Sequence, residues 1–214
     1  MRTRLKFSKT GALAFIGHLD FLRVFGQTIR RAALPAAFSQ GFNPHLLLSF
    51  ALPLPLGMES LNDYADLTLE KEVPSAEIIQ KLNAVAPRGL IIKDAYPVED
   101  KAASVVCVAD YGFKTLGARP LDPLHLEVER VLAEKEIVIA KKTKKGIKDT
   151  DIRADIFSIE ADGDVLKMRL SAGSARFLHP LTVAGLLYEE TPSAAAVTRL
   201  ELYRSGEGGG LVTL

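Results

Sequence analysis

The fold is decided by residues 4–35, which read RLKFSKTGALAFIGHLDFLRVFGQTIRRAALP. Apolar and polar side chains alternate at the start of this stretch, which predicts a strand with an interruption or short hairpin at Ser8–Gly11. From Leu19 onward the apolar spacing changes to three and four residues, which is the spacing of one helical face. The helix is predicted to begin at Gly17 or His18 and to end before Pro35. The apolar face consists of Leu19, Leu22, Phe25, Ile29 and Ala33.

Further elements continue the pattern to about residue 98. Residues 38–52, 64–70 and 90–93 have extended character, and Ser75 is a favourable N-cap for a second helix. Residues 1–98 therefore follow the order strand, helix, strand, strand, helix, strand.

The second half repeats this order. Strands are predicted over residues 105–116 and from Ile137 into a lysine-rich stretch, then over 151–159, 165–170 and 197–203; helices begin near Asp122 and His179. Two such units predict an α+β fold of two tandem ferredoxin-like (βαββαβ) modules with antiparallel sheets. The expected modules are residues 1–100 and 101–214, the second carrying a basic loop at 141–153 and a flexible, glycine-rich tail.

The composition limits the possible chemistry. The chain has 214 residues with 27 basic and 26 acidic side chains, and Cys107 is its one cysteine. One cysteine excludes an intramolecular disulfide, a CxxC metal or redox site and a three-cysteine iron–sulfur cluster, so the chain is not itself a radical-SAM enzyme. No signal peptide is visible, and the longest apolar stretch, 46–56, is too short to span a bilayer. We therefore expect a cytoplasmic protein with no membrane contact, no metal and no cofactor.

The near-neutral total charge conceals a segmental pattern. Residues 1–45 carry seven basic side chains and one acidic one, residues 59–100 carry four basic and nine acidic ones, and residues 141–153 carry six basic and two acidic ones. If the two basic segments meet in the fold, they can follow a phosphate backbone. The alternative is that both are solvated surfaces with no ligand.

Residues 39–45, SQGFNPH, combine a tight backbone with several hydrogen-bonding groups. Phe42 offers a stacking surface for a base, and Gln40, Asn43 and His45 offer donors and acceptors. The alternative is a turn whose polar groups satisfy their own backbone.

His18 is predicted at a helix N-terminus, where the helix dipole favours the neutral imidazole. Lys9 lies nearby in the sequence. The pair suggests a metal-independent endoribonuclease in which His18 acts on the 2′-hydroxyl and Lys9 on the phosphate. The alternative is a histidine that packs against the following strand.

Several of these motifs together suggest a family. The motifs are RLKFSKTG at 4–11, FIGHLD at 15–20, FSQGFNPH at 38–45, SFALPLPLG at 49–57, KKGIK at 144–148 and DIR at 151–153. They resemble the radical-SAM-linked protein family of unknown function. The resemblance implies a partner, a radical-SAM protein with a cobalamin-binding-like region, and a role near RNA.

The sequence thus predicts an RNA-binding accessory protein that presents RNA, such as tRNA or rRNA, to a radical-SAM partner. The residues expected to hold phosphates are Lys9, Arg30, Arg31, Lys144, Lys145, Lys148 and Arg153. Those expected to recognise a base are Gln40, Phe42, Asn43 and His45, with Asp20, Ser39 and Asp151 in orienting roles. Two alternatives remain: the endoribonuclease using His18, and a protein-only interaction module that docks the partner through residues 46–56.

Overall fold

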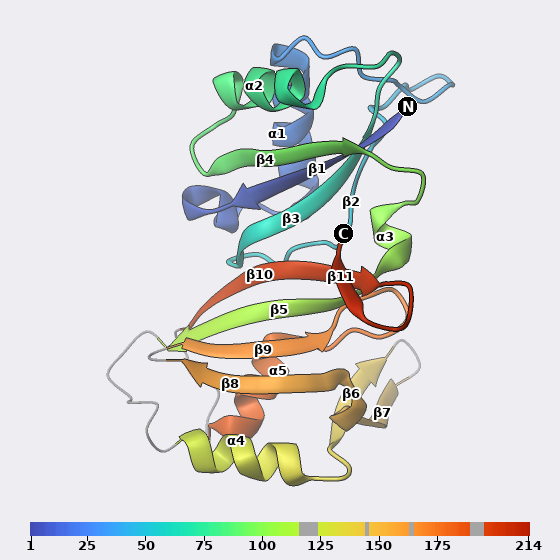
Figure 1. Cartoon of the computed structure of the whole chain (residues 1–214). Coiled ribbons are helices and arrows are strands. Elements are labelled where there is room, and N and C mark those ends of the chain that lie inside the picture. Colours follow the sequence, from blue (N-terminus) through green and yellow to red (C-terminus); the bar gives the residue numbers. More distant parts are fainter. Residues whose placement is uncertain (116–123, 144–145, 163–164, 189–194) are drawn as a thin grey trace.

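The computed structural model describes residues 1–115, 124–143, 146–162, 165–188 and 195–214. Its fold is a mixed α+β fold built on one large, mostly antiparallel sheet of nine strands (Figure 1). The strands lie in the order β4-β1-β3-β10-β5-β9-β8, with β2 paired on β3 and β11 paired on β10. Their bounds are β1 Arg2–Lys9, β2 Leu48–Phe50, β3 Glu59–Thr68, β4 Leu90–Pro97, β5 Val106–Thr115, β8 Ile156–Asp162, β9 Val165–Ser171, β10 Ala195–Ser205 and β11 Leu211–Thr213.

Two helices cover the first part of the sheet, α1 (His18–Arg31) and α2 (Ser75–Val85). Helix α1 begins and ends close to its predicted positions, and α2 begins at Ser75 with Pro74, not Ser75, as its N-cap. The buried face of α1, however, contains Phe21, Phe25, Thr28 and Ile29, whereas Leu19 is 68% exposed. The predicted apolar face is therefore rotated, because the helix packs its aromatic side chains onto β1 rather than its first leucine.

The second part of the sheet carries α4 (Leu124–Ala133) and α5 (Pro180–Leu187), with a short helix α3 (Ala102–Val105) before β5. Figure 1 looks onto β10, β5, β9 and β8 with α5 behind them and α4 below. Helix α5 begins next to His179, as predicted, and His179 caps it by accepting a hydrogen bond from the Leu181 N–H at 3.2 Å. The predicted N-cap of α4, Asp122, lies outside the described residues.

The two parts meet along a seam between β3 and β10, which pair in parallel at Glu59–Thr198 and Ser60–Arg199. Glu201 on β10 accepts hydrogen bonds from Tyr64 and Lys6 across this seam, each at 2.7 Å. The hydrophobic core of the second part also takes in side chains of the first. These are Ala51, Leu54, Met58 and Tyr64. The sheet and one core therefore run across the expected module boundary at residue 100.

Three local expectations differ from the structure. A 3-10 helix, η1 (Gly11–Phe15), follows β1 in place of the expected interrupted strand or short hairpin, and only Leu48–Phe50 of the segment 38–52 forms a strand. The lysine-rich stretch forms a separate two-stranded ribbon, β6 (Val138–Thr143) with β7 (Gly146–Asp151), followed by a 3-10 turn η2 (Arg153–Asp155). The glycine-rich tail makes a turn closed by Gly206 N–H donating to the Gly210 carbonyl, and it returns the chain to β10 as β11.

Candidate functional site

The loop of residues 39–45 has a closed base. Phe38 and Leu46 form an isolated bridge, and the Ser39 N–H donates to the His45 carbonyl at 2.8 Å. The Ser39 hydroxyl accepts the His45 backbone N–H at 3.1 Å and lies 2.7 Å from His45 Nδ1. Gly41 has a φ of 128°, a value that favours glycine. Ser39 therefore orients His45, and the loop is held at its neck by side-chain and backbone bonds together.

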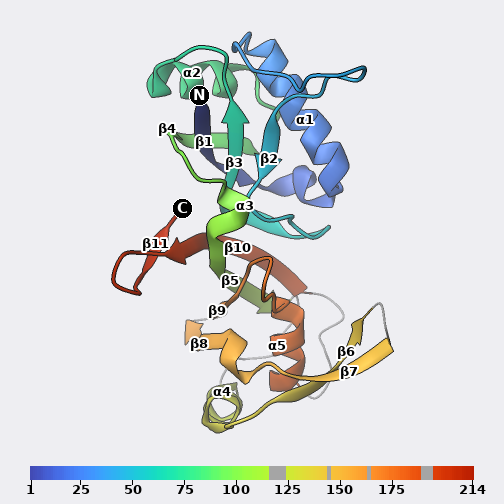
Figure 2. The ribbon, with the colours of Figure 1, turned by 90° about the vertical axis from the view of Figure 1, so that its right-hand side faces the viewer.

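The tip of this loop is open to solvent. Phe42 is fully exposed, and Gln40, Asn43 and His45 are exposed beside it. Leu46, at the base of the loop, packs against Gly26 of α1. Figure 2 shows the light-blue loop ahead of β2 projecting at the same end of the molecule as the C-terminal end of α1.

The last turn of α1 supplies cations at that end. Arg30 and Arg31 are exposed, and their side chains make no hydrogen bond or ion pair with the described residues. Arg23, about two turns earlier in α1, is paired with Asp20 at 2.7 Å, and both side chains are largely exposed. Asp20 therefore pairs with Arg23, and no hydrogen bond or ion pair of the described residues joins it to the loop of residues 39–45.

The predicted phosphate ligands of the second basic segment divide into three cases. Lys148 is exposed on β7, while Lys144 and Lys145 lie outside the described residues. Arg153 donates to the backbone carbonyls of Leu132, Glu134 and Ile156, so its guanidinium ties the end of α4 to β8. Asp151 accepts the N–H groups of Ile137 and Arg153, each at 2.9 Å.

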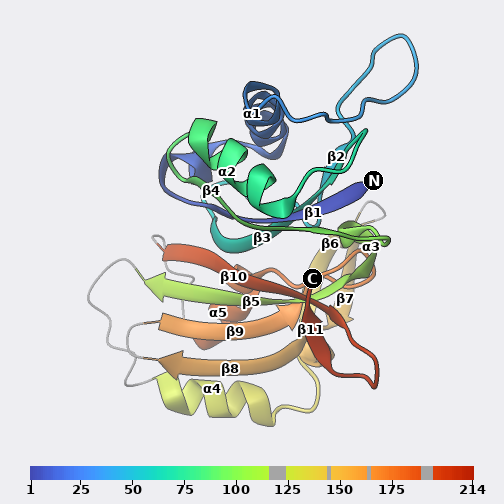
Figure 3. The same ribbon diagram turned by 45° about the horizontal axis from the view of Figure 1, so that its top comes forward.

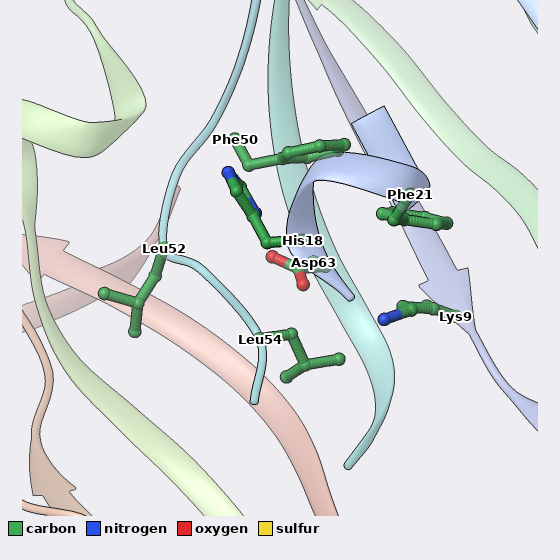
Figure 4. Close-up of a pocket in the computed structure, with 7 residues that line it drawn as sticks. All are labelled: Lys9, His18, Phe21, Phe50, Leu52, Leu54 and Asp63. Atoms are coloured by element: carbon green, nitrogen blue, oxygen red, sulfur yellow. The ribbon is translucent and has the colours of Figure 1, made fainter. Parts of the chain in front are cut away.

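Lys9 and His18 line one small cavity, as Figure 4 shows. The cavity measures about 10 Å³, which is the size that holds one water molecule. Its other walls are Phe21, Phe50, Leu52, Leu54 and Asp63. The His18 ring stands edge-on to the Phe50 ring with 5.6 Å between centroids. Lys9 itself is only 1% exposed, so its ammonium faces the interior rather than a ligand in solvent.

A buried charged cluster surrounds this cavity. The Lys9 ammonium donates to the Ile16 carbonyl at 3.2 Å and lies 4.8 Å above the centre of the Phe21 ring. Asp63 on β3 pairs with Arg199 of β10, and Arg199 also donates to the Leu52 carbonyl at 3.0 Å. Lys9 and Arg199 are therefore two buried cations beside one buried carboxylate at the seam, and the Nε of Arg199 has no hydrogen-bond partner among the described residues.

Burial lowers the pKa of Lys9 from its ordinary value of 10.5; Asp63 opposes this shift and Arg199 adds to it. Between the lowered pKa and 10.5 the unfolded chain binds more protons than the folded one, so this contribution to stability rises with pH and is lost as pH falls. We expect Lys9→Met to remove that rise while leaving stability near neutral pH unchanged or higher.

Urea unfolding of both proteins between about pH 8 and pH 10.5 measures this difference. The raised pKa of the half-buried Tyr96, at about 12, acts in the opposite direction in both proteins and cancels in the comparison. Identical pH slopes for wild type and Lys9→Met would contradict the assignment.

Asp63 and Arg199 escape prediction as site residues, although the sequence holds a signal for Asp63. In the predicted strand, Ala65, Leu67 and Leu69 share one side by alternation. Asp63 falls on that same apolar side, and the structure buries it there. The sequence therefore indicates Asp63 as a charged residue at an inward-facing strand position. Its partner Arg199 is identified only through the long-range pairing of β10 with β3.

Within the described part of the chain, the cavity that contains Lys9 and His18 does not bring the other predicted site residues together. The cavity beside His18 contains no residue of 39–45 or 141–153. Figure 2 places the 39–45 loop in the upper half of the molecule and the β6–β7 ribbon in the lower half. No three His, Cys, Asp or Glu side chains gather as metal ligands among the described residues. No helix in the described ranges is long and apolar enough to cross a membrane.

Comparisons with known proteins identify a family and show limited similarity to solved structures. A family model described as "Uncharacterized protein conserved in bacteria (DUF2344)" matches residues 2–180. No curated protein sequence matches the chain. Among solved structures, a chain in the "Crystal Structure of a Cbf5-Nop10-Gar1 Complex" is similar with a TM-score of 0.48 and 10% identity. That match covers 94% of this chain and 48% of the other, so this chain spans about half the length of its structural neighbour.

Proposed function

The chain belongs to the DUF2344 family of uncharacterized proteins conserved in bacteria, and we propose that it is an RNA-binding accessory protein. The observation that carries the proposal is the fully exposed Phe42 on a loop closed by hydrogen bonds, at the same end of the molecule as Arg30 and Arg31, whose side chains have no partner in the described part of the chain. An aromatic ring with free cations nearby is the usual chemistry for an unpaired nucleotide: the ring stacks on the base and the cations contact phosphates.

The pattern of ion pairs favours the end of the molecule with Arg30 and Arg31 as the RNA-binding surface. The open face of the second part of the sheet is less suitable. There Arg169 pairs with Asp110 at 2.7 Å and lies over the Tyr203 ring, and Lys167 pairs with Asp162. Cations already paired gain less from a phosphate, because the existing partner must be given up. Arg30 and Arg31 carry no such penalty.

The proposal extends to a partner and to the fold. The strand orders β4-β1-β3-β2 and β10-β5-β9-β8 support two ferredoxin-like modules, with the β6–β7 ribbon as an insertion in the second. The family resemblance supports a radical-SAM enzyme as the protein that receives the RNA, in the cytoplasm.

The protein-only alternative has less support, since Ala51 and Leu54 of the segment 46–56 are buried and Leu56 is its one large, strongly exposed apolar side chain.

The test is binding of a fluorescent single-stranded RNA, followed by anisotropy at several salt concentrations. We expect affinity to fall as salt rises, and Phe42→Ala to weaken binding about tenfold, since a base–aromatic stack is worth roughly 1–3 kcal/mol. The matched control is Phe157→Ala, which removes a half-exposed ring from β8 in the other part of the molecule. Equal losses in the two variants, or no RNA binding by the wild type, would refute the proposal.

A further inference from the structure

The register of the β6–β7 ribbon sets two lysines directly opposite each other. Lys141 of β6 pairs with Lys148 of β7, so both side chains leave the same face of the ribbon. Lys148 is exposed and has no side-chain partner among the described residues, and Lys141 makes one long hydrogen bond, 3.4 Å, to the Phe177 carbonyl. Like charges in such a position destabilise a strand pair, and an anion between them removes the repulsion.

The ribbon pairs with no other strand of the described residues, and it meets the core of the second part through the partly buried Ile139. Its two strands form a sheet of their own, apart from the nine-stranded sheet. An isolated two-stranded hairpin is marginally stable in water. A ribbon that also carries a lysine pair and the exposed Ile147 is therefore poorly explained as a purely structural element.

The chemistry of the ribbon differs from that of the 39–45 loop. Residues 138–151 read VIAKKTKKGIKDTD, with no aromatic, arginine, asparagine or glutamine side chain. Unpaired bases stack on aromatic rings or arginine planes, so the ribbon lacks the stacking surface that the loop has in Phe42. Lysines on a projecting ribbon suit the phosphates of a duplex, where the bases are already paired.

The loop of residues 39–45 and the β6–β7 ribbon lie in opposite halves of the molecule, so a single ligand that contacts both must be extended. Figure 2 shows the ribbon leaving the lower half of the molecule on the side from which the 39–45 loop leaves the upper half, and Figure 3 shows them from another direction. We propose that the β6–β7 ribbon, with Lys141 and Lys148, is a second RNA site that binds the backbone of a duplex segment. The ligand class is then structured RNA with a stem next to unpaired nucleotides, an inference that rests on the proposed function of the loop.

Three RNA probes test this inference: a single strand, a blunt duplex and a stem–loop that joins the two. We expect the wild-type protein to bind the stem–loop most tightly. Lys148→Gln should weaken duplex and stem–loop binding, lower the salt slope by about one, and leave single-strand affinity unchanged. Phe42→Ala should weaken single-strand and stem–loop binding and leave duplex affinity unchanged. Lys167→Gln, which removes an equal charge from an ion-paired lysine on β9, should change none of the three affinities.

The outcomes separate this inference from the proposed function. If Lys148→Gln leaves duplex affinity unchanged, or weakens single-strand binding equally, the ribbon is not a duplex site. If the single strand fails to bind while duplex binding remains sensitive to Lys148→Gln, the loop function is refuted and the ribbon site is supported. If no RNA probe binds, both proposals fall.

Discussion

Replacing Asp63 with asparagine should lower the free energy of unfolding by about 3–5 kcal/mol, the usual cost of removing one partner from a buried ion pair. Asp63 is 3% exposed, and its carboxylate is the counter-ion of Arg199, which is fully buried. Lys9 is buried beside them, so the substitution leaves two cations in the interior without a negative charge. Urea unfolding followed by circular dichroism at neutral pH measures the loss.

A control and a rescue make this prediction specific to charge. Asp20→Asn removes a carboxylate from an exposed pair with Arg23 and should cost about 0–1 kcal/mol. Adding Lys9→Met to the Asp63→Asn variant should recover part of the loss, because it removes one of the two unbalanced cations. A loss at Asp63 no larger than at Asp20, or a double variant less stable than Asp63→Asn alone, would contradict the interpretation.

The second large effect is expected at Phe7, where replacement by alanine should cost about 3–5 kcal/mol. Phe7 is completely buried on β1. Its ring centroid lies 5.1 Å from that of Phe25, 5.8 Å from that of Phe50 and 5.9 Å from that of Phe21. Alanine leaves a cavity between β1, α1 and β2 that these rigid rings fill only in part.

Thermal and urea unfolding of Phe7→Ala test this packing argument. Phe15→Ala is the matched control, because Phe15 on η1 is 73% exposed and its loss should change stability by no more than about 0.5 kcal/mol. Similar losses for the two variants would mean that the aromatic cluster does not hold α1 on the sheet.

Helix α1 illustrates how far periodicity reaches. The sequence predicts its position well, because the three- and four-residue spacing and Pro35 are local signals. The same spacing places Leu19 on the buried face, yet Leu19 is exposed and Phe21 is buried. Which side of a helix faces the core depends on the partner surface, here Phe7 and Phe50, and that surface is made by segments distant in the sequence.

The residues of the candidate site also differ in how far the local sequence predicts them. The loop of residues 39–45 is identified from its residue types, since glycine, asparagine and proline force a turn whose side chains point outward. Lys9 is misplaced by the same reasoning, because its position next to Thr10-Gly11 suggests an exposed turn, while β1 continues through it and buries it. Local sequence reports which backbone conformations are favoured, but burial follows from what packs on top.

The sequence by itself determined the alternation of strands and helices, the position of α1, the start of α5 next to His179, and the absence of a cysteine-based metal or redox site. Only the tertiary structure decided that β10 joins β3, that Asp63, Lys9 and Arg199 share one buried cluster, and that the lysine-rich stretch is a ribbon with Lys141 opposite Lys148. The physical reason is the distance along the sequence over which each kind of interaction acts. Backbone preferences and periodicity act over a few residues, whereas strand pairing and charge burial join residues as far apart as Asp63 and Arg199.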